Sequence, residues 1–454
     1  MSGRPVIVLG GGAAGLCAGL LLARHGHPVT LFEQDAVDAT TASQALQWNR
    51  PGIPHFRQPH AFIPRGRAEL RRHLPDVYAS LLSAGAWDVD LRRKLPGDPV
   101  AEDEELQYVG VRRPVIEWAL RQAVLAEPLL TVRDRASVKG VATENNRVSG
   151  ARVDGHTADG DLVVDALGRR TMTATWADSS DCGVVYYSRY FRLREGAELP
   201  DGPWLLGPRG DLGYFGYSTF PGDDGTFAAL LAVPPRTAEW RLLKDERAWS
   251  AAVELIPALR QWVDPELVEP ITDVLPMAGL RNTLRAYDPA APVGLFPVGD
   301  AYCHTDPVLA HGLAFSIIHA TALVAALSEH DDLGDAGAAY SAVTQPALCE
   351  RYALATALDS QRLQMWLGEP VDYTSPDGDY ALFSMVAAGA AAQVDPDIFR
   401  AFVRRIGLLD STEVLDRDVV LQRRIEAVFS ELRRGPRPAP GPTREEMAAA
   451  IASA

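Results

Sequence analysis

The first thirty or so residues alternate between short apolar runs and a glycine-rich turn. Residues 6–9 are apolar without interruption and predict a buried strand, and residues 29–33 predict a second one. The stretch between them, from residue 14 to residue 25, has the length and composition of a helix. This order predicts a strand–helix–strand unit whose two strands are parallel.

The pattern changes several times further along the chain. Helical spacing returns at residues 65–84 and 114–126, and short strands with polar turns are expected over residues 130–167. Residues 181–280 alternate apolar and polar positions between Gly and Pro turns, which predicts an antiparallel sheet. The chain is then mostly helical to its end, apart from a proline-rich linker over residues 435–442 and a short capped helix from Thr443.

Composition and charge narrow the class of protein. The chain is 47% apolar and 23% charged, which is ordinary for a globular protein, and its formal net charge of -15 disfavours binding to nucleic acid or to anionic lipid. Arginine greatly outnumbers lysine, as is typical of GC-rich bacterial genomes. The N-terminus has no signal-peptide pattern, and no apolar run reaches the roughly 18 to 20 residues that span a bilayer. We therefore expect a cytoplasmic protein with no membrane span.

The cysteines argue against a dithiol or metal centre. Cys17, Cys182, Cys303 and Cys349 form no CxxC pair, and none stands at metal-ligand spacing from a histidine. A disulfide reductase is thus disfavoured, and no metal site is expected.

The turn after the first strand has the spacing of a dinucleotide-binding site. Gly10 permits the tight turn, Gly12 lets the backbone approach a pyrophosphate, and Gly15 allows close packing of helix on strand. The helix begins at Ala13 and Ala14, so its N-terminus faces the anion. Glu33 ends the second strand, where its carboxylate can accept a hydrogen bond from a ribose hydroxyl and would repel the extra phosphate of NADP; Gln34 follows it in the predicted site.

A second motif follows the apolar run at residues 295–298. Gly299 and Asp300 come directly after it, with Asp300 placed to bind the hydroxyls of a ribityl chain. Pro307 predicts a loop that lies along a flat ring, and Gly312 and Leu313 open an apolar helix whose positive end would stabilise an anionic reduced flavin. Together, the two motifs predict a bound FAD.

These motifs resemble those of the FAD-dependent monooxygenases related to p-hydroxybenzoate hydroxylase, styrene monooxygenase and the flavin-dependent halogenases. The resemblance extends over residues 5–330 and implies non-covalent FAD, with Arg113 near its phosphate and Val138 also in the cofactor site. It implies an α/β fold in which a discontinuous Rossmann-like FAD-binding domain carries an inserted antiparallel β-sheet substrate domain and C-terminal helices. The implied divisions are residues 1–180 and 286–330 for FAD, 181–285 for substrate and 331–454 for the helical region.

The chain departs from the single-component hydroxylases at two places. Residues 165–170 read Asp-Ala-Leu-Gly-Arg-Arg in place of an Asp-Gly motif that serves both FAD and NADPH, and Ala310, His311 and Ala314 replace the expected Gly, Gln and Asn. We therefore expect reduced FAD from a separate flavin reductase, while NAD(P)H acting directly on the protein stays open, with O2 as co-substrate.

Halogenation is disfavoured because residues 213–221 lack the tryptophans of the halogenase element and only Lys94 is a remote candidate for its essential lysine. The expected chemistry is instead oxygen transfer from a flavin C4a-hydroperoxide, as hydroxylation or epoxidation of an apolar, aromatic or unsaturated small molecule.

Several polar and aromatic side chains are candidates for contact with the substrate. The candidate catalytic residues are His60, Arg189, His304 and His311, and the candidate substrate residues are Tyr187, Arg189, Tyr214 and Tyr217. Each has a plain alternative: a solvated loop for His60, a half-buried strand for Arg189, hydrogen bonding without chemistry for the other histidines, and a packed core for the aromatic residues. Two other functions stay open, namely an FAD-dependent reductase of an alkene or prenyl chain and a non-catalytic FAD-binding partner. The oligomeric state is left open.

Overall fold

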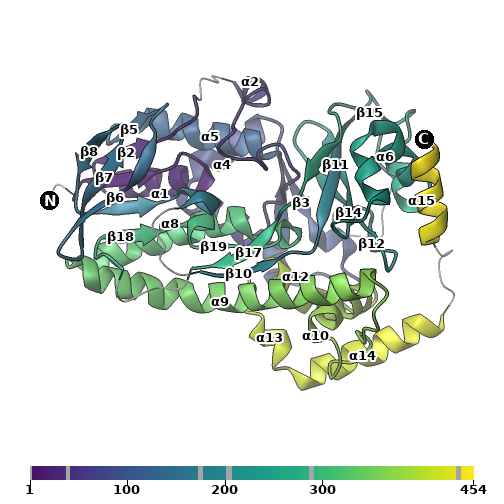
Figure 1. Cartoon of the computed structure of the whole chain (residues 1–454). Coiled ribbons are helices and arrows are strands. Elements are labelled where there is room, and N and C mark those ends of the chain that lie inside the picture. The colour runs from purple at the N-terminus through teal and green to yellow at the C-terminus, as the bar shows by residue number, and fades with distance from the viewer. Residues whose placement is uncertain (1–2, 37–40, 172–176, 201–206, 286–290, 436–440) are drawn as a thin grey trace.

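The structure is a computed structural model that describes residues 3–36, 41–171, 177–200, 207–285, 291–435 and 441–454. Two sheets stand at opposite ends of the molecule, and one long helix, α9, runs beneath both (Figure 1).

The first sheet is parallel and has five strands in the order β18-β9-β1-β2-β5. Its members are β1 (Val6–Leu9), β2 (Val29–Phe32), β5 (Leu130–Arg133), β9 (Val163–Asp165) and β18 (Leu295–Pro297). The predicted strand–helix–strand opening is confirmed, since β1 and β2 pair in parallel with α1 (Ala13–Arg24) between them. The sheet joins both predicted motifs, because β18 pairs with β9 and β9 pairs with β1.

Both faces of this sheet are covered, and alternate residues of one strand reach each side. Val6 and Val8 pack in the core with α1, α5 (Arg113–Ala126) and α8 (His311–Glu329). Ile7 and Leu9 pack against a three-stranded antiparallel sheet made of β6 (Val138–Glu144), β7 (Arg147–Val153) and β8 (His156–Asp159). The parallel sheet is therefore buried on both sides, as such sheets usually are.

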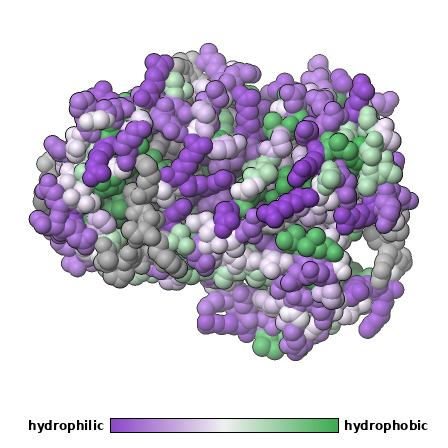
Figure 2. Space-filling view, viewed as in Figure 1, coloured by the Kyte–Doolittle hydropathy of each residue, from purple (hydrophilic) through white to green (hydrophobic). Residues whose placement is uncertain are grey.

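Helix α8 departs from the expectation that no apolar run is long enough to span a bilayer. By length and composition it is apolar enough to cross a membrane, but 61% of its apolar window is buried inside the protein. It packs against α1, α3 (Pro64–His73) and α9 (Leu333–Trp366). The helix is apolar all round because protein surrounds it, and the face in Figure 2 is covered mainly by hydrophilic residues.

The second sheet is antiparallel at its centre, as predicted, and has the order β12-β13-β14-β11-β15, with β16 also paired to β11. Its strands are β11 (Val185–Leu193), β12 (Arg209–Asp211), β13 (Gly216–Pro221), β14 (Thr226–Val233), β15 (Val268–Pro270) and β16 (Leu275–Met277). Two helices inside this segment, α6 (Glu246–Glu254) and α7 (Pro257–Trp262), depart from the expectation of continuous strands. They cover the outer face of the sheet, where Trp240, Trp249 and Trp262 form its core.

Smaller elements connect the two ends of the molecule. The expected helix over residues 65–84 is divided at Pro75 into α3 and α4 (Pro75–Ser83), because Pro removes a backbone donor. The remaining strands are β3 (Trp87–Asp90) with β4 (Gln107–Gly110), and β10 (Asp178–Asp181) with β17 (Arg281–Leu284) and β19 (Cys303–His304). Short helix α2 (Ala42–Ala45) packs against α5.

The C-terminal region is helical, as predicted, but it packs on other parts of the chain and forms no separate unit. Its short helices are α10 (Tyr380–Leu382), α11 (Ala388–Ala391), α12 (Pro396–Ile406), α13 (Glu413–Asp416) and α14 (Val419–Arg434). Residues of α11, α12 and α14 share a core with β3 and β4. The predicted capped helix from Thr443 is α15 (Arg444–Ser453), which packs on the second sheet. Most of the predicted linker, residues 436–440, lies outside the described residues.

Candidate functional site

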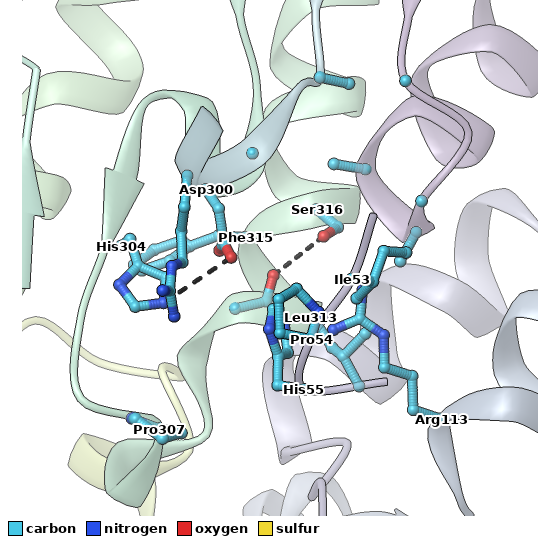
Figure 3. Close-up of a pocket in the computed structure, with 18 of the residues that line it drawn as sticks. Ile53, Pro54, His55, Arg113, Asp300, His304, Pro307, Leu313, Phe315 and Ser316 are labelled. Atoms are coloured by element: carbon cyan, nitrogen blue, oxygen red, sulfur yellow. Dashed lines mark hydrogen bonds and ion pairs between the residues drawn. The ribbon is translucent and has the colours of Figure 1, made fainter. Parts of the chain in front are cut away.

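A cavity of about 520 Å³ lies between the two sheets and brings both sequence motifs together. Figure 3 shows Asp300 and His304 on one side of it and Ile53 and Arg113 on the opposite side. The lining includes these predicted residues: Gly10, Gly12, Ala13, Ala14, Glu33, Gln34, His60, Arg113, Val138, Asp300, His304, Pro307, His311, Gly312 and Leu313. Gly15 and Gly299 do not line the cavity and act through packing.

The glycine turn has the backbone conformation that an anion-binding turn needs. Gly10 has a φ of 102°, and a methyl group on Gly15 would lie 1.8 Å from the Gly10 carbonyl oxygen, so both positions require glycine. A methyl group on Gly12 would meet only Ile53 Cδ1, at 3.5 Å, and Arg113 Nη2, at 4.0 Å. Gly12 therefore opens a space in front of the α1 N-terminus, where no side chain caps the helix and a pyrophosphate would fit.

Glu33 stands at the end of β2 with most of its hydrogen-bonding capacity already used. Its Oε2 accepts from the Gly11 backbone N at 2.7 Å and pairs with Arg50 at 3.0 Å, and its Oε1 accepts from the Asp35 backbone N at 2.8 Å. A carboxylate has about four acceptor positions, so one on Oε1 remains for a ribose hydroxyl. Burial raises the pKa of Glu33, and the Arg50 charge offsets part of that shift.

Arg50 is a buried residue of this site that sequence analysis missed. Its guanidinium is 1% exposed and pairs with Glu33 at 3.0 Å, Asp35 at 3.0 Å and Glu117 at 3.1 Å. Glu117 in turn pairs with Arg113 at 2.8 Å. Arg50 lies in an irregular segment whose contacts no periodicity predicts, so nothing in the sequence marked it.

The second motif is held against the first by a contact that only glycine permits. Gly299 has a φ of 57°, and a methyl group there would lie 2.7 Å from the Ala14 side chain. Its backbone N donates to His319 Nδ1 at 2.9 Å, so that nitrogen carries no proton, and burial lowers the pKa of His319 to about 3. Asp300 follows directly, and its carboxylate borders the cavity 3.9 Å from His304 Nε2.

The loop after Asp306 is fixed by a buried polar network. Asp306 accepts from the Tyr186 hydroxyl at 2.6 Å, from Arg362 at 2.9 Å and from the Val308 backbone N at 3.1 Å. Burial raises the pKa of Asp306, but the Arg362 charge and these hydrogen bonds outweigh it, so the pKa lies below its usual value. Asp306 therefore stays ionised and holds Pro307 at the cavity wall.

Among the histidines that line the cavity, His60 is neutral. Burial lowers the pKa of His60 to about 3, and the nearby Arg113 adds to the shift. His60 Nδ1 donates to the Gln58 carbonyl at 2.7 Å, and its Nε2 lies 3.3 Å from Arg113 Nη1. His60 therefore borders the cavity as a neutral ring whose one proton, on Nδ1, is held by the Gln58 carbonyl. His304 Nδ1 donates to the Arg281 carbonyl at 2.8 Å.

His311 differs from these because neither of its ring nitrogens has a hydrogen-bond partner among the described residues. It is 2% exposed, it lines the cavity, and burial lowers its pKa well below the ordinary value. Unpaired buried polar groups are rare, and one at a cavity wall indicates contact with a bound molecule.

Comparisons with known proteins agree with the first of the two motifs. Residues 5–174 match the family model for FAD dependent oxidoreductases. Protein Rv3254 of Mycobacterium tuberculosis (strain ATCC 25618 / H37Rv) is 27% identical over 461 residues, which cover 92% of this chain and 92% of that protein. A stretch of 79 residues is 43% identical to putative oxidoreductase YgfK of Escherichia coli (strain K12), and covers 17% of this chain and 6% of that protein.

Residues 5–174 of this chain therefore resemble the FAD dependent oxidoreductases.

Solved structures show that the chain has the fold of flavin-dependent monooxygenases and halogenases. Flavin-dependent brominase Bmp2 superposes with a TM-score of 0.62 at 17% identity, covering 95% of this chain and 98% of that chain. PqsL, a probable FAD-dependent monooxygenase from Pseudomonas aeruginosa, gives 0.59 at 17% identity over 80% and 98%. The tetrameric form of 2-methyl-3-hydroxypyridine-5-carboxylic acid oxygenase gives 0.57 at 17% identity over 81% and 93%.

The structure corrects the predicted substrate residues of the oxidoreductase. Tyr187, Tyr214 and Tyr217 pack in the outer core of the second sheet, and Arg189 pairs with Glu246 of α6 at 2.6 Å. None of the four borders the cavity. The alternation along the strand was assigned correctly, but the side that helices would cover was not, because α6, α7 and α15 were not predicted to lie there.

The inner face of the second sheet carries the neighbouring side chains instead. On β11, Tyr186 reaches Asp306, and Ser188 donates to Gln58 Oε1 at 2.7 Å. On β13, Phe220 lines the cavity. Phe220 lies on the face of β13 opposite to that of Tyr217, which packs in the outer core.

The described residues contain no group of three or more His, Cys, Asp or Glu arranged to hold a metal ion. All four cysteines are free. Burial raises the pKa of Cys303, which lines the cavity, to about 12, so it is a neutral thiol.

Proposed function

We propose that the oxidoreductase is a monooxygenase that transfers one atom of O2 to an apolar, aromatic or unsaturated small molecule. The observation that carries this proposal is a pocket of about 70 Å³ that shares Ala61, Phe220 and Ala310 with the large cavity. A substrate in that pocket would lie beside the Pro307–Ala310 loop and be shielded from water, as oxygen transfer requires.

The residues present fit an FAD molecule. Gly12 and the α1 N-terminus would hold the pyrophosphate with Arg113, Glu33 would accept from a ribose hydroxyl, and Asp300 would bind the ribityl chain. The loop from Pro307 to Leu313 would lie along the flavin ring, with the α8 N-terminus near it. The cofactor supplies the activation of oxygen, and the chain supplies position and exclusion of water.

The electrons would come from a separate flavin reductase. Asp165 is fully buried and accepts from its own loop, at Leu167 N (3.0 Å) and at the Thr171 hydroxyl. It does not border the cavity, so it would not serve a nicotinamide cofactor as the Asp-Gly motif of single-component hydroxylases does.

Halogenation is the second candidate, since brominase Bmp2 shares the fold over most of this chain. Its chemistry uses a lysine near the substrate, and no lysine lines either cavity in the described part of the chain. This observation favours oxygen transfer. An FAD-dependent reductase of an alkene or prenyl chain would consume no oxygen when its substrate is added. A non-catalytic FAD-binding partner would likewise consume none.

One experiment separates these functions. The FAD-loaded protein is reduced anaerobically and mixed with oxygenated buffer, and flavin absorbance is followed on the millisecond scale alongside hydrogen peroxide release. A monooxygenase would show a short-lived absorbing species before oxidised flavin, and little peroxide when substrate is present. Direct return to oxidised flavin with full peroxide release, with and without every candidate substrate, would rule the proposal out.

A second assay tests the source of electrons. NADPH oxidation is measured with the protein alone and after a flavin reductase is added. We expect turnover only with the reductase, and rapid NADPH oxidation by the protein alone would show a single-component enzyme.

A further inference from the structure

The pocket of about 70 Å³ has mostly apolar walls that come from three parts of the chain. The second sheet, the loop of residues 307–313 (the flavin loop) and the C-terminal helices supply, among others, Phe220, Val308, Leu309, Ala310, Met385 and Val403. The volume is roughly half that of an engineered cavity of about 150 Å³ that binds benzene, so a ligand ring would extend into the larger cavity. An apolar body therefore fits here, and a polar group on the wall would select among such bodies.

One polar group at this pocket is buried and has no partner. Tyr108 of β4 borders the pocket and is 2% exposed, and its hydroxyl has no hydrogen-bond partner in the part of the chain that the structure describes. The ring packs in the core that β3 and β4 share with the C-terminal helices, where Phe383 and Val403 lie. Burial raises the pKa of Tyr108 well above its ordinary value, so the hydroxyl keeps its proton and can donate it to a ligand.

The other polar side chains at the pocket do not need a ligand. Arg209 and Ser218 border it from the second sheet, but both retain surface that water can reach. Water satisfies an exposed charge or hydroxyl, whereas a buried donor without an acceptor is costly. Of these three side chains, Tyr108 therefore gains most from a ligand that brings an acceptor.

We infer that the substrate carries a neutral carbonyl oxygen on its aromatic or unsaturated body, and that this oxygen accepts a hydrogen bond from the Tyr108 hydroxyl. This inference rests on the proposed function, because it takes the pocket as the substrate site. A carbonyl oxygen is an acceptor that matches one fixed donor. A carboxylate at this place would exchange its hydration for a single hydrogen bond, and a plain hydrocarbon would leave the hydroxyl unpaired.

The test compares two small molecules of the same shape on the FAD-loaded protein. Acetophenone has a carbonyl oxygen where α-methylstyrene has a methylene group. The Kd of each comes from the change in the visible flavin spectrum and, independently, from the rise in melting temperature. In Tyr108→Phe the ratio of the two Kd values should shift against the ketone by about fivefold or more, because its hydrogen bond is lost. The alkene should bind this variant at least as tightly as it binds the wild type, because the unpaired hydroxyl is gone.

Tyr187→Phe is the matched control, since Tyr187 is buried in the outer core of the second sheet and borders neither cavity. It should leave the ratio unchanged. Urea unfolding without ligand separates a purely structural role of Tyr108, because Tyr108→Phe should keep or raise the wild-type midpoint. A lower midpoint would show that the hydroxyl already has a partner and would overturn the inference. So would a failure of acetophenone to bind, or a ratio that Tyr108→Phe leaves unchanged.

Failure of the proposed function is a separate result. If ketones bind through Tyr108 but no ketone is oxygenated, the pocket is a carbonyl-binding site on a flavoprotein that is not a monooxygenase. If α-methylstyrene is oxygenated and Tyr108→Phe leaves the ratio unchanged, the inference is overturned and the monooxygenase proposal stands.

Discussion

At the scale of single residues, the cofactor site depends on glycines that serve two different structural purposes. Gly10, Gly15 and Gly299 are required by the protein itself, because a side chain at each would strain or strike the backbone or a neighbouring side chain. Gly12 leaves open space that a cofactor would use. Substitution at the two kinds of position should therefore have different consequences.

Gly12→Ala should weaken FAD binding and leave the fold intact. The added methyl group contacts the protein only at ordinary distances, but it occupies the space before the α1 N-terminus. We expect the Kd for FAD to rise by about tenfold to a hundredfold, with a change in unfolding free energy under about 1 kcal/mol. Fluorescence titration with FAD and urea unfolding of the apoprotein measure the two quantities. Gly435→Ala, far from the cavity, is the matched control, and an unchanged Kd in Gly12→Ala would contradict the assignment of the pyrophosphate site.

Arg50→Met should destabilise the protein strongly, because it leaves three buried carboxylates without their shared cation. Breaking a buried charge pair from one side costs about 3 to 5 kcal/mol. Urea unfolding at neutral pH measures the loss. Arg423→Met removes two ion pairs of similar length at the surface, with Asp377 and Glu426, and should have a far smaller effect. Equal losses of unfolding free energy in the two variants would show that the buried ion pairs of Arg50 stabilise the fold no more than ion pairs at the surface.

At the scale of elements, helix α9 connects the C-terminal region to the flavin loop. It carries Asp359 and Arg362 to Asp306, and Asp359 Oδ2 accepts from Asn282 Nδ2 at 2.8 Å. Burial, reinforced by the nearby Asp306 charge, raises the pKa of Asp359 to about 9. The pair of acids therefore holds one proton at neutral pH, with Asp306 ionised and Asp359 neutral.

Asp359→Asn should remove one part of the dependence of stability on pH. The folded protein keeps the Asp359 proton over a range in which the unfolded chain has lost it, so this contribution to stability falls as pH rises from about 4 to about 9. Between about pH 7 and about pH 9 the wild type should lose roughly 1 to 3 kcal/mol relative to Asp359→Asn, which imitates the neutral acid. Urea unfolding of both proteins across this range measures the difference, and parallel curves would show that Asp359 is ionised in the folded state.

At the scale of the whole molecule, the chain returns to the second sheet with its last helix. Met447 and Ile451 of α15 are buried in the outer core of that sheet, and Arg444 pairs with Glu239 at 2.8 Å. This helix lies on the face opposite the cavity and supplies no residue to it. The outer core and the cavity are therefore separate in space, although both lie against the second sheet.

A chain that ends at Gly435 should lose stability and keep its cofactor affinity. Removing α15 uncovers the outer core, and losing two buried aliphatic side chains costs about 2 to 5 kcal/mol each. We expect a lower urea midpoint and a Kd for FAD within about twofold of the full chain. Arg444→Ala is the control, since it removes only a partly exposed ion pair. A parallel loss of FAD affinity would show that α15 supports the cofactor site through the sheet.

Local rules were sufficient where the chemistry is local. The strand–turn–helix around Gly10 to Gly15, the Gly299-Asp300 turn and the capped helix after Thr443 all depend on neighbours within a few residues. Backbone conformation and capping are set at that range, so the motifs and the coarse order of strands and helices followed from the sequence.

Only the tertiary structure decided which face of β11 and β13 is on the side of the cavity. It also decided which residues from distant segments lie together there. A strand shows two faces of nearly equal composition, and the choice between them is made by α6, α7 and α15, up to 260 residues away in the chain. Arg50 comes from a segment without a motif, and its role follows from the three carboxylates that it meets after folding. The sequence by itself therefore determined the cofactor and the class of fold, whereas packing between remote elements decided the substrate side of the site, because burial and pairing are properties of neighbours in space.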